Sequence, residues 1–154
     1  MDGKTHRKIG TAAGAVVAFA RSSPADDLWK RIAESVGGAI AGNMGARVPD
    51  WLEPAIHSHH RSTVHSIGFG AKVLTAAAAA TSAWEESCRA RATYFAERRR
   101  EPTTAGVEWI KSFLGELFWR LAAGFISGAS AGFGSHLVLD ATTPRGLPVF
   151  IRGF

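Results

Sequence analysis

Apolar and small residues recur at helical spacing along most of the chain, and no stretch shows the alternation typical of a strand. The pattern predicts helices from about Thr5 to Arg21 and from about Pro24 or Ala25 to Met44. A third helical stretch covers about Thr63 to Glu97, either continuous through its helix-forming alanine run or broken in the middle, and the last covers about Ala105 to Asp140. The sequence therefore predicts an all-α fold, a compact bundle of about five helices.

Prolines, glycines and polar residues mark where these helices begin and end. A serine–proline pair with two following aspartates marks the start of the second helix: Ser23, Pro24, Asp26 and Asp27. Pro49 and Pro54 make residues 46–62 a loop, and residues 98–106 are the clearest exposed connection. Glycines late in the second helix permit close packing or a backbone break, and glycines in the last helix are expected to bend it.

Composition fits one globular domain over residues 1–154. The chain is 46% hydrophobic, which excludes a disordered protein, and its single cysteine, Cys88, excludes an internal disulfide and a cysteine-rich zinc module. The apolar run at residues 9–20 lacks the cleavage site of a secretory signal. A net charge of +5 favours polyanions or anionic lipid head groups as neighbours.

Two apolar runs approach the length of a membrane span, but both contain charges. Residues 66–84 include Lys72, and residues 113–139 include Glu116 and Arg120. Charges inside such runs are costly in lipid, so buried or interfacial helices are favoured over true spans.

Five arginines lie in a short segment, residues 89–100. A solvated helix face is the ordinary interpretation of such a run. A patch that faces phosphate or lipid is the alternative, because the planar arginine fork suits phosphate.

The most informative pair near the end of the chain is His136 and Asp140. Residues four apart project from the same helix face, so an imidazole nitrogen and a carboxylate oxygen can share one divalent ion there. The intervening residues are apolar, which indicates a buried turn, and a buried aspartate needs a partner or a metal. A capping or hydrogen-bonded pair in the core is the alternative.

Four of the six histidines crowd into residues 49–66, beside Asp50 and Glu53. His60 and His65 are five apart, which suits a shared site only if His60 lies in the loop and His65 in the first helical turn. His57 and His59 fit solvent-exposed positions better. His6 can be an ordinary surface histidine, and Asp50 an ordinary turn residue. Imidazoles and carboxylates from three separate segments nevertheless favour zinc, with manganese or iron as alternatives, and an open catalytic position.

Three ordered motifs, "THRKIG", "GARVPDWLEP…HHRSTVHS" and "GFGSHLVLDATTPRGLPVF", resemble the YdjM-like family of membrane-bound, metal-dependent hydrolases. That family looks related to the helical zinc phospholipase C and single-strand nuclease superfamily. The resemblance implies one to three zinc ions held by His6, Asp50, His60, His65, His136 and Asp140. It also makes Arg61 a phosphate-binding residue, and Ser66 and Ser135 hydrogen-bonding partners of the ligands.

One departure from the motif concerns the second acid of a Pro-Asp-x-Asp step, which is Leu52 in this chain. Either Glu53 replaces it or one metal site is missing, and Asp50 or Glu53 is the candidate general base. The resemblance implies hydrolysis of a phosphoester at the inner (cytoplasmic) membrane, and the apolar helices, five tryptophans and basic charge make phospholipid the first candidate substrate. A single-strand nuclease, a cytoplasmic location, and a non-catalytic membrane or assembly protein with a structural metal site are the alternatives.

Overall fold

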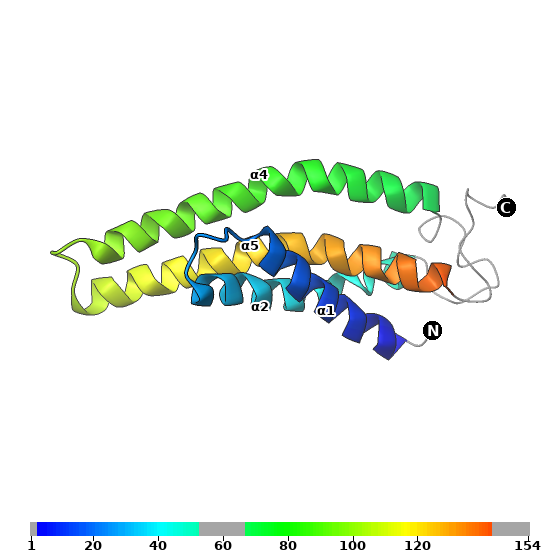
Figure 1. Cartoon of the computed structure of the whole chain (residues 1–154), viewed down its shortest axis with the longest axis horizontal. Helices are drawn as coiled ribbons and strands as arrows, with labels where there is room; N and C mark the ends of the chain where they lie inside the picture. The colour runs from blue at the N-terminus through cyan, green and yellow to red at the C-terminus, as the bar shows by residue number, and fades with distance from the viewer. Residues whose placement is uncertain (1–2, 53–66, 143–154) are drawn as a thin grey trace.

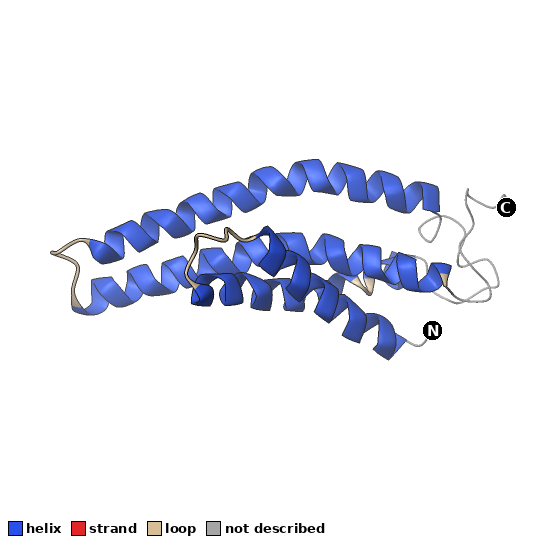
Figure 2. Cartoon of the chain, in the orientation of Figure 1, coloured by secondary structure: helices blue, strands red, loops and turns tan. Residues whose placement is uncertain are grey.

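Five helices account for most of the chain in a computed structural model that describes residues 3–52 and 67–142 (Figure 1). They are α1 (Gly3–Arg21), α2 (Leu28–Gly45), α3 (Val48–Leu52), α4 (Ile67–Arg100) and α5 (Gly106–Ala141). Helices are the only regular secondary structure among these residues (Figure 2). The predicted all-α fold of about five helices is confirmed.

The helices are arranged around α5. Helices α4 and α5 form a long antiparallel hairpin, and α1 and α2 pack against α5 and against each other (Figure 1). Helix α1 begins, and α5 ends, at the end of the bundle opposite the α4–α5 connection (Figure 1). Residues from the two ends of the chain are therefore neighbours at this end.

Three predicted boundaries were wrong. Residues 48–52 were expected in a loop, but they form α3, because Pro49 occupies a first-turn position where no backbone donor is needed. Helix α2 begins at Leu28 rather than at residue 24 or 25, since Asp26 turns away to bind the Arg120 guanidinium at 2.7 and 2.9 Å. Helix α4 runs unbroken through its alanine-rich middle, one of the two predicted alternatives, and ends at Arg100 rather than near residue 97.

Glycines allow the backbones of α1 and α2 to touch. A Cβ atom on Gly38 would overlap the carbonyl oxygen of Gly14, and one on Gly42 would overlap that of Gly10. Each helix thus presents two glycines four residues apart, the spacing that lets helices in membrane proteins approach closely. The glycines late in α2 serve close packing, and α2 continues through them to Gly45.

Helix α2 packs on α5 in the same way, through the same two glycines. A Cβ atom on Gly128 would overlap the carbonyl oxygen of Gly38, and one on Gly132 would overlap that of Gly42. Gly124 lies equally close to the backbone of Glu34. Helix α2 is therefore held between two helices with almost no side chain in between.

Glu116 and Arg120, the charged residues inside the apolar run of α5, face the interior. Arg120 is 4% exposed and donates to Glu34 at 2.9 Å as well as to Asp26. The guanidinium of Arg89 on α4 lies 2.8 Å from the carboxylate of the same Glu34 and 3.4 Å from that of Glu85. Glu34 and Glu85 are fully buried, so their carboxylates depend on these arginines.

A second group of charges completes this ionic network nearer the α4–α5 connection. Glu116, also fully buried, accepts from Arg99 at 2.8 Å and lies 3.9 Å from Lys30. The network contains five acids and five bases: Asp26, Asp27, Glu34, Glu85 and Glu116 with Arg21, Lys30, Arg89, Arg99 and Arg120. Its formal charges cancel, so the charges in the apolar α5 are neutralised inside the bundle.

The arginine-rich segment of α4 is therefore only in part the solvated face that its composition indicates. Arg89 and Arg99 belong to the ionic network, and the guanidinium of Arg91 lies over the ring of Trp119 at 4.5 Å. Arg100 is exposed.

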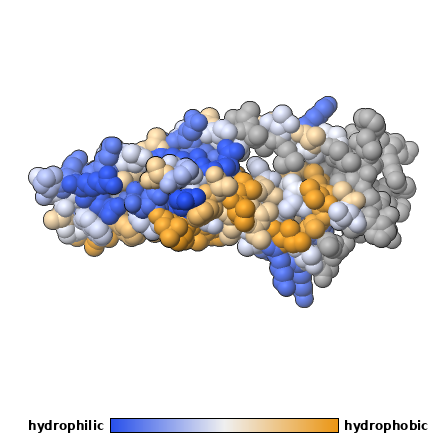
Figure 3. All heavy atoms as spheres, in the orientation of Figure 1, coloured by the Kyte–Doolittle hydropathy of each residue, from blue (hydrophilic) through white to orange (hydrophobic). Residues whose placement is uncertain are grey.

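Large apolar side chains lie mainly on the outside. An exposed stripe follows α2 at every fourth residue: Leu28, Ile32, Val36, Ile40 and Met44. Most of the buried apolar residues are alanines, including Ala18, Ala41, Ala92 and Ala123. Figure 3 shows apolar surface over the middle of one face and hydrophilic surface toward the α4–α5 connection. Among the described residues, α5 alone has the length and composition to cross a membrane.

The glycine contacts generate a stability prediction. Gly42→Ala should lower the free energy of unfolding by about 1–3 kcal/mol, the typical cost of overpacking, because its Cβ meets backbone atoms of Gly10 and Gly14 that cannot move separately. Thermal unfolding in detergent, followed by circular dichroism, measures the change. Gly3→Ala is the control, since a Cβ there meets nothing within 4 Å. Equal stability of the two variants would contradict the close packing.

The ionic network generates a second stability prediction. Arg120→Met should destabilise the protein by about 3–5 kcal/mol, because it leaves the buried carboxylate of Glu34 without one of its two arginines. Chemical unfolding measures the loss. Lys111→Met, which removes the exposed pair with Glu108, is the control and should change little. Similar effects from both substitutions would show that the network does not support the fold.

Candidate metal centre

The last turns of α5 carry His136 and Asp140 on one face, as their spacing predicts. His136 is 0% and Asp140 is 2% exposed, so the predicted burial of this turn is confirmed. The Nε2 atom of His136 lies 3.5 Å from Oδ2 of Asp140.

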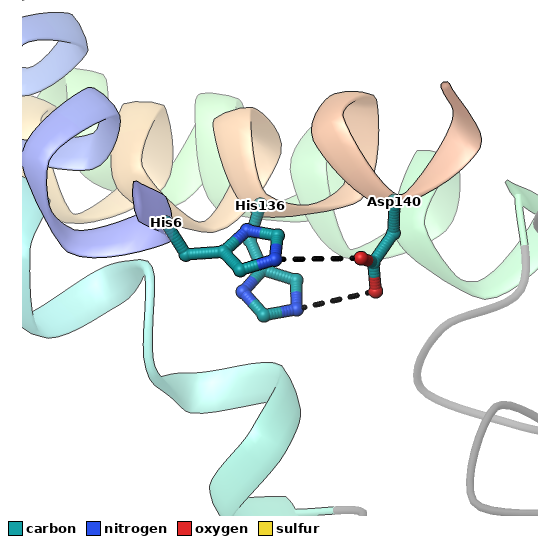
Figure 4. A group of neighbouring side chains, drawn as sticks. All are labelled: His6, His136 and Asp140. Atoms are coloured by element: carbon teal, nitrogen blue, oxygen red, sulfur yellow. Dashed lines mark ion pairs between the residues drawn. The ribbon is translucent and has the colours of Figure 1, made fainter. Parts of the chain in front are cut away.

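His6 reaches the same carboxylate from α1. Its Nε2 lies 3.4 Å from Oδ1 of Asp140, and its ring stacks on His136 with centroids 4.0 Å apart and planes inclined by 22°. Figure 4 shows the two imidazoles side by side, each directed toward a different oxygen of Asp140. The two ends of the chain therefore meet at one buried cluster of three side chains able to hold a metal ion.

One hydrogen bond fixes how His136 presents its ring. Nδ1 lies 2.7 Å from the carbonyl oxygen of Ala46, and a carbonyl can only accept, so Nδ1 carries a proton. In the neutral ring Nε2 then has a lone pair, and that lone pair faces the Asp140 carboxylate. A proton or a metal cation between the two atoms makes this contact attractive. Such a bond from the second ring nitrogen to a carbonyl is what orients metal-binding histidines.

Asp50 borders the cluster from α3. Its Oδ1 lies 3.6 Å from Nε2 of His136, and its side chain is 49% exposed. The cluster thus has a closed side between α1 and α5 and a half-open side at Asp50.

The separations between these donor atoms suit a metal better than direct bonds. The three nitrogen–oxygen distances are 3.4, 3.5 and 3.6 Å, whereas N–H···O bonds measure about 2.7–3.2 Å. Ligands arranged tetrahedrally at about 2.0–2.1 Å from zinc lie about 3.3–3.4 Å apart. These separations leave room for an ion between the side chains, and His6, His136 and Asp140 form a buried group able to hold a metal ion.

Burial also keeps His6 ready for a cation. Desolvation, and next the positive charge that His136 can carry, lower the pKa of His6 below its ordinary value of 6.5. The ring is therefore neutral at pH 7, the form that binds metals. Its Nδ1 is buried without a hydrogen-bond partner, so stacking on His136 and the approach to Asp140 orient the ring.

The structure brings together four of the six predicted metal ligands: His6, Asp50, His136 and Asp140. His60 and His65 lie outside the described residues, as do Glu53, Arg61 and Ser66. The prediction for Ser135 was wrong, because its hydroxyl donates to the carbonyl of Gly132 on its own helix at 2.8 Å. The role of the Ala46 carbonyl could not be predicted from the sequence, because every residue type has a backbone carbonyl.

Leu52, where the motif has an acid, does not belong to the cluster. Its side chain is 61% exposed, and residues two apart on a helix point about 200° away from each other. The departure therefore removes nothing from the four residues that meet here.

These observations define an all-α protein with a buried His/Asp cluster, suited to a metal ion, between the first and last helices. The sequence model of the YdjM inner membrane protein family matches residues 1–151, and the chain belongs to that family. It is accordingly a membrane-associated protein of the inner membrane, as the resemblance implied. Comparison with curated proteins and with solved structures gave no significant match.

The cluster predicts a metal site that single substitutions weaken. His136→Ala should lower zinc affinity at least about 10–100-fold, because it removes a ligand together with its bond to Ala46. Elemental analysis after dialysis against graded free zinc measures the affinity. Ser135→Ala, one residue away and bonded only to its own helix, is the control. Unchanged zinc affinity in His136→Ala would contradict the site.

Proposed function

We propose that the protein is a metal-dependent hydrolase of phosphoesters, with phospholipid as the leading substrate. The observation that carries the proposal is the setting of His136, whose Nδ1 is fixed by Ala46 while Nε2 faces the carboxylates of Asp140 and Asp50. This arrangement of neutral imidazoles and carboxylates, with one half-open side, is the type found in catalytic zinc sites.

His6, His136 and Asp140 would hold the metal, with Asp50, His60 and His65 as the further predicted ligands. Zinc fits this donor set, and manganese or iron are compatible with it. Asp140 offers one oxygen to each imidazole, which is consistent with one ion or with several. When bound, the metal lowers the pKa of a coordinated water and polarises the phosphoryl oxygen.

Asp50 is the candidate general base, because it is the half-exposed carboxylate at the edge of the cluster. It would accept a proton from the attacking water as the new oxygen–phosphorus bond forms. The ester bond to phosphorus then breaks, and the leaving oxygen takes up the proton. Glu53 stays the predicted alternative base, and Arg61 the predicted phosphate-binding residue.

Membership of an inner membrane protein family and the exposed apolar stripe of α2 favour phospholipid over nucleic acid. The net charge of +5 is the observation that favours a single-strand nuclease. A structural metal site in a non-catalytic protein is the third possibility, and activity assays separate the three.

Zinc-loaded protein in mixed micelles should release phosphorylated head groups from phospholipid faster than it degrades single-stranded DNA. Asp50→Asn should lower kcat about 10²–10⁴-fold through loss of the base, and His65→Ala should lower the metal content. Glu101→Gln, an exposed acid at the far end of the bundle, is the control.

Absence of turnover on either substrate, with metal content unchanged in His65→Ala, would contradict the proposal. Turnover of DNA alone would indicate the nuclease. A melting temperature that falls sharply with chelator, in a protein without activity, would indicate the structural site.

A further inference from the structure

A groove of about 590 Å³ lies beside the metal centre, between the start of α1 and the corner where α2 leads into α3. Its wall includes Lys4, Arg7, Ala46, Arg47, Asp50 and Trp51. Lys4 and Arg7 lie three apart on α1, so they project from the same side of that helix.

The groove is continuous with the metal centre. Asp50, which lines the groove, lies 3.6 Å from Nε2 of His136, and the carbonyl of Ala46 accepts from Nδ1 of the same ring. Arg7 directly follows His6 on α1. A molecule in the groove would therefore reach the half-open side of the cluster.

The groove is basic, with three cations to one carboxylate. Within the described part of the chain, Lys4, Arg7 and Arg47 form no ion pair with a carboxylate. The contrast is with the bases of the ionic network, every one of which contacts a carboxylate. The positive charge of the groove is thus available to an anion from outside.

Arg47 is held in place by a chain of hydrogen bonds. Its Nη2 donates to Oδ1 of Asn43 at 3.0 Å, and Nδ2 of Asn43 donates to the hydroxyl of Thr11 at 3.0 Å. That hydroxyl in turn donates to the carbonyl of Arg7 at 2.7 Å. The Nε atom of Arg47 is buried without a hydrogen-bond partner, and an unused buried donor is costly unless a ligand engages it.

We propose that this groove binds the phosphate group of the substrate, with Arg7 and Arg47 on its oxygens and Lys4 at the mouth. The inference rests on the proposed hydrolysis of phosphoesters and names the residues that bring the phosphorus to the metal. A fixed guanidinium suits phosphate because it donates two parallel hydrogen bonds. Trp51 and Leu52, both about 60% exposed on α3, place apolar surface beside the groove, where a lipid chain would continue from the phosphate.

Binding of inorganic phosphate to the metal-free full-length protein in detergent, followed by ³¹P NMR, tests the groove apart from the metal. Arg47→Gln and Arg7→Gln should each weaken binding about 10-fold, the loss expected for a charge-assisted contact. Arg47→Lys, which keeps the charge but loses the fork, should be intermediate. The matched controls are Lys8→Gln, an exposed position on α1, and Arg100→Gln at the far end of the bundle.

Circular dichroism and zinc content establish that each variant is folded with its metal centre intact. Phosphate affinity in Arg7→Gln and Arg47→Gln equal to that of the parent protein would overturn the inference. Weaker phosphate binding in these variants, without turnover by any zinc-loaded form, would support the groove while the proposed hydrolysis failed. Turnover with unchanged phosphate binding and unchanged KM in both variants would overturn the groove alone.

Nanodiscs containing phosphatidylglycerol distinguish the two sources of the phosphate group. Competition between inorganic phosphate and these nanodiscs, lost in Arg47→Gln, would identify a lipid head group as the ligand. Phosphate binding that depends on Arg47 without such competition would identify a free phosphate compound.

Discussion

The close contact of three backbones, those of α1, α2 and α5, is the constraint on which the rest of the structure depends. Gly38 meets both Gly14 of α1 and Gly128 of α5, so α2 fixes α1 and α5 in one register. A slip of one helical turn moves a helix by about 5.4 Å, which would separate His6 from Asp140, now 3.4 Å apart. The meeting of His6 with His136 and Asp140 thus depends on glycine packing some distance along the same helices.

The same packing determines which side chains are inside. Helices in backbone contact leave room for alanine and serine, and large apolar side chains such as Ile40 and Phe118 lie on the outer surface. Hydrophobic burial in water would favour the opposite arrangement. In an inner membrane protein the outer surface meets lipid, and packing and internal polar contacts hold the helices together. The neutral ionic network around Glu34 and Arg120 supplies such contacts.

Local patterns predicted the helices and much of the site, and long-range contacts account for what they did not predict. The four-residue spacing of His136 and Asp140, and the ordered motif that begins at His6, placed three members of the cluster correctly together. Asp26 has the sequence context of a helix start, yet its partner, Arg120, is 94 residues away. The propensity of Pro49 indicates a loop, but residues 48–52 form α3, which packs on α5. Local propensity does not include that long-range contact. Helix propensity likewise does not predict how α1, α2 and α5 are aligned along one another, which their glycine contacts determine.

The two buried polar groups of this bundle differ in the chemistry of their partners, and that difference separates structure from function. In the ionic network, arginine and lysine donors meet carboxylates at hydrogen-bonding distances such as 2.8 Å, so each charge already has its counterion. At the His/Asp cluster the described partners of Asp140 are imidazoles at 3.4 and 3.5 Å, distances longer than direct hydrogen bonds, and the group is able to hold a metal ion. Cations without carboxylate partners lie next to this cluster, in the groove at Arg7 and Arg47. The carboxylates of the ionic network thus have cationic partners, whereas the His/Asp cluster and the cations beside it are the groups on which the proposed function rests.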